Sequence, residues 1–235
     1  IIFGAFLERT GIANFFISFA NRLAGWSSGG PAKVAVISSA LCGMVSGSSV
    51  GNTVTTGSFT IPMMKKTGYK PEFAGAVEAA ASTGGQIMPP IMGAAAFLMA
   101  EYMKLPYAQV AVKAILPAIL YFTGIFIAVH LEAKKLGLKG VSRDELPKWK
   151  LLLRDCYLIL PLILLVWLVS SGSKTMSHSA AYSILAAIAV GFVNFFLQSK
   201  RGEGETAPQT TGKALATAGK RSFFSAVESL SLIHI

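Results

Sequence analysis

The hydrophobic positions of this chain fall into long segments with at most one or two charged residues, and these segments are separated by short polar and basic stretches. A helix needs about 20 apolar residues to cross the hydrocarbon core of a bilayer. Segments that meet or approach this length occupy residues 73–100, 105–131, 156–170 and 180–197, and residues 1–7 look like the end of an earlier span. The pattern predicts an all-α polytopic membrane protein, cut from a longer chain.

Residues 34–64 carry no charge, yet their centre reads "SGSSVGNTVTT", Ser46 to Thr56. One straight helix of this length would exceed the bilayer core at about 1.5 Å per residue, and its polar centre would face lipid. Basic residues flank both ends, at Lys33 and at Lys65 and Lys66, which favours both ends on one side. We therefore predict two short helices joined by a polar turn, a re-entrant hairpin that reaches part-way across the membrane.

The remaining segments complete the expected organisation. Residues 11–26 alternate aromatic and polar positions at helical spacing, which predicts an interfacial helix. We divide the chain into a span end with an interfacial arm (1–33), the hairpin (34–66), a broken transmembrane helix with the next span (67–131), a cytoplasmic or interfacial linker (132–153), two transmembrane helices (154–199) and a cytoplasmic loop with the start of a truncated segment (200–235).

Composition and charge support the membrane interpretation. The chain is 53% hydrophobic and 14% charged, against about 25% charged residues in soluble domains, and its mean hydropathy is +0.57. The net charge of +10 comes from basic clusters in alternate loops, as the positive-inside rule predicts for cytoplasmic loops. Because no basic patch is interleaved with aromatic residues, we expect no nucleic-acid partner. The two cysteines, Cys42 and Cys156, indicate neither a disulfide framework nor a zinc site.

The turn of the hairpin is the first candidate site. Its glycines permit a tight turn and close approach of a ligand, and its hydroxyl and amide groups can bind one. The start of the second arm offers backbone N–H groups to an anion, and carbonyls near Val45 and Ser46 can bind Na⁺. The candidate residues are Ser46, Gly47, Ser48, Ser49, Gly51, Asn52 and Thr53. The alternative is a packing face, because Gly43, Gly47 and Gly51 recur every four residues.

A second polar interruption, "STGGQIMPP", lies in the middle of the next span. A proline pair removes backbone donors and interrupts the helix, so carbonyls near Gly84 become available to a cation. Paired interrupted segments are the best sequence indication of the midplane site of a transporter. The candidate residues here are Ser82, Thr83, Gly84, Gly85, Pro89 and Pro90. The alternative is a simple proline kink.

The segment from "ALCGMVSGSS" through "IPMMKKTGY" to "QIMPPIM" resembles the large membrane subunit of tripartite ATP-independent periplasmic (TRAP) transporters. The following "AEYMKLPY" resembles versions in which the small and large membrane subunits are fused. The resemblance implies an elevator-type, Na⁺-coupled importer of organic acids such as C4-dicarboxylates in a bacterial or archaeal inner membrane. It implies a periplasmic solute-binding protein, the rest of the permease or a small membrane subunit, and lipid as partners. It assigns the two interruptions to half of the Na⁺ and substrate site, with no cofactor other than Na⁺.

Glu78 departs from the better-known members of that family, in which we expect a neutral residue. An unpaired carboxylate is expensive at membrane depth. Three interpretations are open: Glu78 lies near the cytoplasmic edge, pairs with Lys113, or binds a coupling cation.

Two other functions are compatible with parts of the sequence. Residues 47–51 match G-x-S-x-G, the nucleophile motif of serine hydrolases, and Asp155 and His178 follow in the order of a triad. The predicted topology places those two residues at opposite ends of a span, which argues against an intramembrane hydrolase with Ser49 as nucleophile. A polar hairpin tip is also compatible with an ion channel. We expect a transporter and not an enzyme.

Overall fold

The computed structural model describes residue 7 and residues 10–138, 140–141, 146–147, 149–170 and 176–199. Every regular element in these residues is a helix, which confirms the predicted all-α class. The elements are α2 (Ile12–Ala24), α3 (Gly30–Ser46), α4 (Ser49–Lys66), α5 (Pro71–Gly84), η1 (Gly85–Ile87), α6 (Ala94–Tyr102), α7 (Tyr107–Lys135), α8 (Trp149–Asp155), η3 (Cys156–Ile159), α9 (Leu160–Ser170) and α10 (Met176–Ser199).

The chain divides into two compact units, essentially residues 3–191 and 192–235, and the structure is described below for the first. All but Leu7 of the span end predicted at residues 1–7, and all of the segment predicted at residues 200–235, lie outside the described residues.

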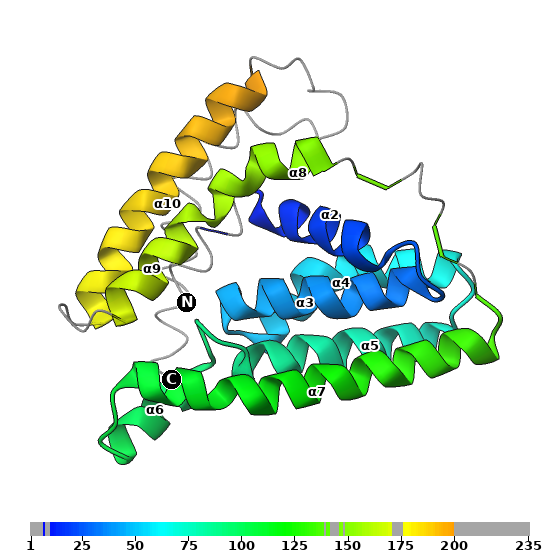
Figure 1. The fold of residues 1–235 in the computed structure, drawn as a ribbon, viewed down its shortest axis with the longest axis horizontal. Coiled ribbons are helices and arrows are strands. Elements are labelled where there is room, and N and C mark those ends of the chain that lie inside the picture. The colour runs from blue at the N-terminus through cyan, green and yellow to red at the C-terminus, as the bar shows by residue number, and fades with distance from the viewer. Residues whose placement is uncertain are drawn as a thin grey trace. The chain divides into compact units, whose positions relative to one another are not determined.

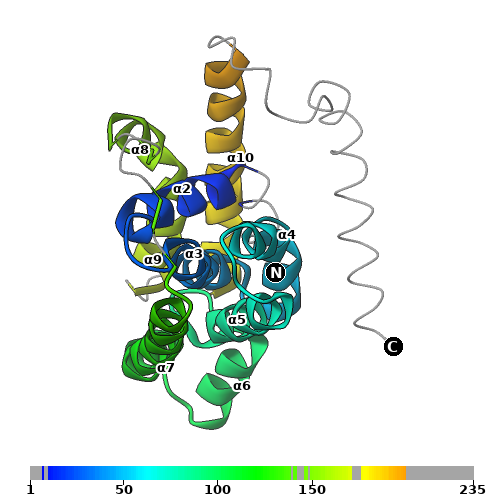
Figure 2. The same cartoon turned by 90° about the vertical axis from the view of Figure 1, so that its right-hand side faces the viewer.

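Four helices form the centre of the first unit. α3 packs against α4, α5 and α7, and α4 also packs against α5. Figure 2 shows α3 surrounded by these helices, and Figure 1 shows that α3 and α4 run antiparallel, as do α5 and α7. The start of α3, the end of α4 and the end of α7 therefore lie at one end, where Lys33, Lys66 and Lys135 are found. The turn between α3 and α4 lies at the opposite end.

Local sequence accounts for the ends of the hairpin helices. Gly29 and Gly47 flank α3 with φ of +69° and +62°, a left-handed conformation that glycine adopts without a steric penalty. Ser48 caps α4, because its Oγ accepts a hydrogen bond from the N–H of Gly51 at 3.2 Å. The hairpin turn thus consists of Gly47 and Ser48, with helix on both sides.

The segment between α4 and α5 is fastened to the start of α3. The hydroxyl of Tyr69 donates to the carbonyl of Gly29 at 3.4 Å, and its ring stacks on Phe73 at a centroid distance of 5.6 Å. Burial, together with the nearby charge of Glu132, raises the pKa of Tyr69 to about 12. The phenol therefore remains a neutral donor at physiological pH.

The helix that begins at Pro71 is interrupted where the sequence predicted a break. α5 ends at Gly84, a short 3₁₀ turn follows, and α6 begins only at Ala94. Within the intervening loop the N–H of Gly93 donates to the carbonyl of Gln86 at 2.8 Å. The hydroxyl of Tyr107, at the start of α7, donates to the carbonyl of Pro90 at 2.8 Å. These bonds hold the loop in place of the helical bonds that the proline pair removes.

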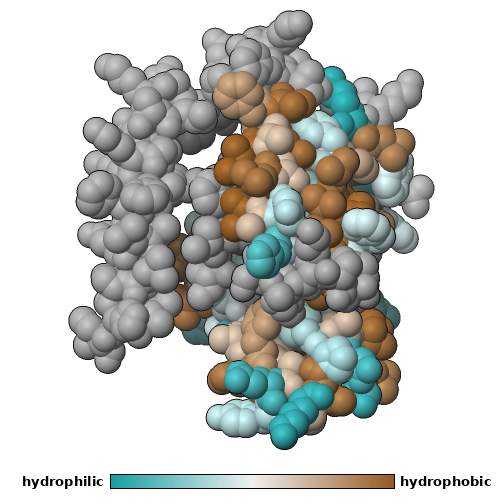
Figure 3. All heavy atoms as spheres, turned by 90° about the vertical axis from the view of Figure 1, so that its left-hand side faces the viewer, coloured by the Kyte–Doolittle hydropathy of each residue, from teal (hydrophilic) through white to brown (hydrophobic). Residues whose placement is uncertain are grey.

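Long apolar helices and exposed apolar side chains suit a lipid environment. Two helical segments in the described residues, 107–135 and 152–169, are each long and apolar enough to cross a membrane. α7 exposes large apolar side chains, among them Val112, Leu116, Ile119, Leu120 and Ile127. On the face shown in Figure 3, hydrophobic side chains likewise lie exposed beside hydrophilic ones. Apolar surface of this extent is rare on soluble monomers.

Candidate functional site

The hairpin tip contacts the interrupted helix directly. The N–H of Ile91 donates to the carbonyl of Met44 at 3.2 Å, which joins the loop after η1 to the last turn of α3. The Nε2 of Gln86 donates to the Oγ of Ser49 at 3.0 Å, which joins η1 to the first residue of α4. The hairpin tip and the break, which the sequence predicted as two separate sites, are thus in contact and form one structural unit.

Two glycines allow this approach. A Cβ placed on Gly43 would lie 2.5 Å from the Cα of Gly85, and one on Gly85 would lie 2.6 Å from the Cα of Gly43. Real Cβ atoms essentially never come this close to backbone, so α3 and η1 can approach this closely only because both residues lack a side chain. The packing role that the glycine spacing suggested is therefore present at Gly43, beside the functional interpretation of the tip.

The predicted tip residues have different roles. Ser46, Gly47, Ser48, Ser49 and Gly51 lie at or beside the turn. Gly47 faces the loop after η1, since a Cβ there would lie 3.0 Å from the carbonyl oxygen of Met92. Thr53 donates its hydroxyl to the carbonyl of Ser49 within its own helix at 2.8 Å.

Asn52 lies inside the helix packing and is fully buried. Its Nδ2 donates to the carbonyl of Ser39 at 2.9 Å and to the Oγ of Ser82 at 3.3 Å, so it links α4 to α3 and α5. Its Oδ1 has no hydrogen-bond partner in the described part of the chain. The carbonyl of Ser39 fixes this orientation, because a flipped amide would place two acceptors face to face.

The residues predicted at the break also differ from one another in what they contact. Gly85 meets Gly43, whereas a Cβ on Gly84 would lie 2.5 Å from the Tyr121 ring, so Gly84 packs on α7. Thr83 is exposed and donates its hydroxyl to the carbonyl of Ala79 in its own helix at 2.8 Å. Pro90 is held through its carbonyl as described above, next to Pro89. The break therefore presents backbone to the hairpin mainly at residues 85–93.

Below the tip, Glu78 lies fully buried between α3, α4 and α5. Its Oε1 accepts hydrogen bonds from Ser39 at 2.6 Å, from Ser82 at 3.1 Å and from Thr56. Its Oε2 accepts from Thr60 at 2.5 Å. Each of the three helices thus contributes a hydroxyl to the carboxyl group, and we call these five residues the Glu78 cluster.

The cluster decides between the interpretations of Glu78. The structure does not support the alternative in which Glu78 pairs with Lys113, because every hydrogen-bond partner of the carboxyl group in the described residues is a hydroxyl. Full burial in the middle of α5 also argues against a position at the water-exposed edge. Binding of a positive charge is the interpretation that stays open.

Sequence reasoning missed four contributors: Ser39, Thr56, Thr60 and Gln86. A signal was available for two of them, because Thr56 and Thr60 are four residues apart on one helix face, as are Glu78 and Ser82. Nothing along the sequence related Ser39 to Glu78, because their contact depends on how α3 packs against α5.

The structure gives no support to a Ser49 hydrolase. The Oγ of Ser49 is hydrogen-bonded to Gln86. Asp155 lies at the end of α8 and His178 near the start of α10, and neither is hydrogen-bonded to Ser49 in the described residues.

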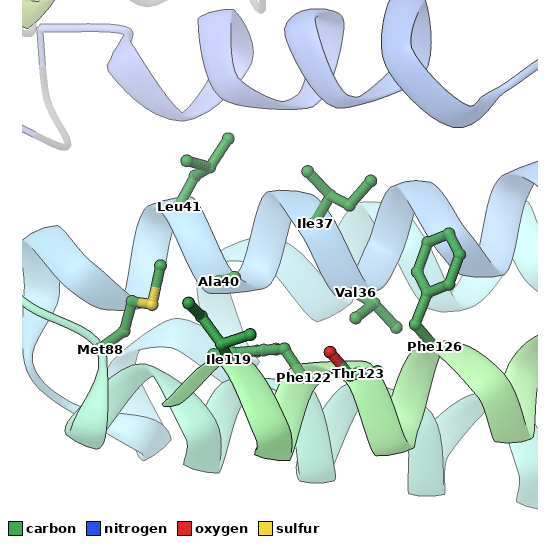
Figure 4. A pocket seen from close by; sticks show the side chains of 9 residues that line it. All are labelled: Val36, Ile37, Ala40, Leu41, Met88, Ile119, Phe122, Thr123 and Phe126. Carbon is green, nitrogen blue, oxygen red and sulfur yellow. The ribbon is translucent and has the colours of Figure 1, made fainter. Parts of the chain in front are cut away.

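A cavity of about 360 Å³ lies between α3 and α7. Figure 4 shows its lining, which is apolar except for the hydroxyl of Thr123. The lining residues are Val36, Ile37, Ala40, Leu41, Met88, Ile119, Phe122, Thr123 and Phe126. Because an ionised substrate needs polar partners, the polar surfaces of the hairpin tip remain the candidate site.

Comparison with known proteins gives a consistent family. A family model described as the DctM component of tripartite ATP-independent periplasmic transporters matches residues 1–231. The C4-dicarboxylate TRAP transporter large permease protein DctM of Pseudomonas aeruginosa is 26% identical over 198 residues, which are 84% of this chain and 45% of that protein. The protein of the same name from Vibrio cholerae is 27% identical over 206 residues, 86% of this chain and 44% of its own length.

The sialic acid TRAP transporter large permease protein SiaM of Vibrio cholerae is 22% identical over 219 residues, 93% of this chain and 51% of that protein. The chain thus spans about half the length of the curated relatives it matches. The family match and the long apolar helices place it in the inner membrane as a multi-pass protein. Because the family model covers nearly all of its residues, the chain belongs to the DctM component family of tripartite ATP-independent periplasmic transporters.

Proposed function

We propose that this chain forms half of the transport site of a Na⁺-coupled permease that imports an organic acid. The observation that carries the proposal is the contact between the hairpin tip and the interrupted helix, made by Ser49 with Gln86 and by Met44 with Ile91. Two helix interruptions that meet are the arrangement in which a transporter holds ions and anionic substrates. Family membership agrees with this reading.

The chemistry of the tip suits a carboxylate and a small cation. Hydroxyl groups of Ser46, Ser48 and Ser49 can donate hydrogen bonds to an organic anion, and the start of α4 favours negative charge. Carbonyl groups near Val45, Ser46 and Gly84 can bind Na⁺ at the ends of α3 and α5. The names of the relatives suggest a C4-dicarboxylate or a sialic acid as cargo.

A complete transporter needs more than this chain. The family name supports a periplasmic solute-binding protein as the partner that delivers substrate. The rest of the permease would supply the other half of the site, and a small membrane subunit would be separate or fused. In our proposal α3, α4, α5 and η1 move as one rigid body during alternating access, because the Glu78 cluster and the Gly43–Gly85 contact join them.

The test is substrate uptake by the full-length permease in proteoliposomes, together with its solute-binding protein. We expect accumulation of a C4-dicarboxylate or a sialic acid that requires an inward Na⁺ gradient and that fails when K⁺ replaces Na⁺. The Ser49→Ala variant should raise the half-saturating substrate or Na⁺ concentration about fivefold, the equivalent of one lost hydrogen bond of about 1 kcal/mol.

The Ser58→Ala variant is the matched control, because that exposed serine bonds only to the carbonyl of Thr55 in its own helix. Its uptake should equal that of the wild type. Uptake that proceeds equally in K⁺, or that is absent for every organic acid tested, would contradict the proposal.

The re-entrant topology makes a separate prediction for single cysteines in a cysteine-free full-length permease. Trp26 precedes α3 and Lys66 ends α4, and both are exposed. Trp26→Cys and Lys66→Cys should react with a membrane-impermeant thiol reagent from the same side. Val50→Cys, at the tip, should not react from that side, because at about 1.5 Å per residue α4 places it about 24 Å from Lys66, most of the thickness of the bilayer core. Labelling of positions 26 and 66 from opposite sides would show that the hairpin crosses the membrane.

A further inference from the structure

We propose that the apolar cavity between α3 and α7 holds an acyl chain of an anionic phospholipid whose phosphate group binds at Lys33. This lipid site is separate from the hairpin tip, and it does not depend on the proposed substrate. Two observations carry the proposal. One is a buried lysine that has no acidic partner in the described residues. The other is an open apolar cavity whose lining includes the ring on which this lysine lies.

Lys33 carries a charge that the described part of the chain does not balance. Its side chain is only 4% exposed, and its Nζ donates a hydrogen bond to the Oγ of Ser27 at 3.1 Å. The Nζ also lies 5.3 Å from the centroid of the Phe126 ring. Within the described ranges no carboxylate forms an ion pair with it. An ammonium group has three donors, and a buried charge is costly without an opposite charge, so this position favours an anion.

The groups around Lys33 add to the attraction for an anion. Lys134 is close enough for its charge to act on Lys33, and His130 lies within range of both lysines. The Nδ1 of His130 is buried and has no hydrogen-bond partner among the residues that the structure describes. Glu132, the acidic residue on this turn of α7, pairs with Lys135 at 3.5 Å. An anion here would therefore meet positive charge and a histidine nitrogen that can donate to it.

The cavity begins at this positive end and continues along both helices. Phe126 lines it at the end where Lys33 lies, and Leu41, Met88 and Ile119 line it farther along (Figure 4). At about 1.5 Å per residue, α7 extends about 10 Å from Ile119 to Phe126. Ile119 is 54% exposed, so the cavity is open at the surface of the described structure. Its apolar lining and its volume of about 360 Å³ suit part of a hydrocarbon chain.

A phospholipid satisfies both features, whereas a free anion would leave the apolar cavity empty. The cavity lies beside α7, which is long and apolar enough to cross a membrane, so lipid chains surround its opening. Lys33 lies at the end of the helices where Lys66 and Lys135 are found, and the positive-inside rule assigns that end to the cytoplasm. The cytoplasmic leaflet carries anionic lipids, which basic pockets between helices bind through their head groups.

Native mass spectrometry of the purified, delipidated full-length permease tests the proposal without substrate or Na⁺. We expect phosphatidylglycerol to bind, and phosphatidylcholine with the same chains to bind at least tenfold more weakly. Lys33→Met keeps the length of the side chain but removes its charge. It should weaken the binding of phosphatidylglycerol at least about tenfold, the loss expected for one hydrogen bond to a charged group. Lys66→Met is the matched control and should bind as the wild type does, because Lys66 is an exposed lysine at the same end of the helices.

A second variant tests the acyl chain, and it keeps the experiment informative if Lys33→Met does not accumulate in the membrane. Ala40 lines the cavity, so Ala40→Phe should place a ring there and weaken the binding of phosphatidylglycerol about tenfold, the equivalent of about two methylene groups left unburied. Inorganic phosphate at the concentration of the lipid should displace no phosphatidylglycerol from the wild type, because it lacks the chain.

Three results would each overturn the proposal. They are equal binding of the two lipids, equal losses in Lys33→Met and Lys66→Met, and displacement of phosphatidylglycerol by inorganic phosphate. The first two would show that the charge of Lys33 does not select the lipid, and the third would show that the cavity holds no chain. Because lipid binding is measured without transport, failure of the uptake test would not change these outcomes.

Discussion

Replacing Gly43 by alanine is expected to destabilise the folded permease by about 1–3 kcal/mol, the range for forcing extra atoms into a packed core. The new Cβ would lie 2.5 Å from the Cα of Gly85 and 3.3 Å from the Nδ2 of Asn52. Because the first of these neighbours is backbone, α3 and η1 must separate. Thermal unfolding of the full-length protein in detergent should show a lower midpoint.

The Gly75→Ala variant is the matched control, since it makes the same change within a helix. A Cβ at Gly75 would have nothing within 4 Å. Alanine there should stabilise the protein by about 0.4–1 kcal/mol, because it reduces the freedom of the unfolded chain. The two variants should therefore shift the midpoint in opposite directions. Equal shifts would mean that α3 and η1 are not in contact at Gly43 and Gly85.

Replacing Thr60 by valine should also cost about 1–3 kcal/mol, although the two side chains have nearly the same shape. The loss comes from Oε2 of Glu78, which would keep no hydroxyl partner in the described structure. A buried polar atom that loses its partner bears its full desolvation cost. The control is Thr55→Val, because the hydroxyl of Thr55 bonds only to the carbonyl of Gly51 in its own helix.

A double-mutant cycle separates this effect from a change in helix propensity. Replacing Glu78 by methionine removes the carboxyl group, so Thr60→Val should then have little effect on the unfolding midpoint. The coupling between the two positions should match the loss seen in Thr60→Val alone. Additive effects would show that the two side chains do not interact, and would contradict the hydrogen bond between Thr60 and Glu78.

Much of the arrangement of the helices could be predicted along the chain. The apolar segments and the interruption after Gly84 were predicted, and the structure has helices and a break there. The polar turn was predicted within residues 46–52, whereas the structure confines it to Gly47 and Ser48 and begins α4 at Ser49. Each is a local property, since it depends on the hydropathy of one segment or on a glycine or proline within it. The sites assigned to the tip and the break remain predictions, because they concern ligands.

The roles of individual polar residues could not be predicted in this way. Asn52 and Thr53 are neighbours, but Asn52 joins three helices, whereas Thr53 bonds to its own. Gly84 and Gly85 are also neighbours, and one packs on α7 while the other meets α3. Adjacent residues on a helix point about 100° apart, so which one faces a partner depends on where that partner lies.

The sequence by itself determined that this is a helical membrane protein with two polar interruptions, because hydropathy, glycine and proline act locally. Only the tertiary structure decided that the interruptions touch and that Glu78 lies among hydroxyls from three helices. The physical reason is that hydrogen bonds and close glycine contacts between helices are set by helix rotation and spacing, which no single segment encodes.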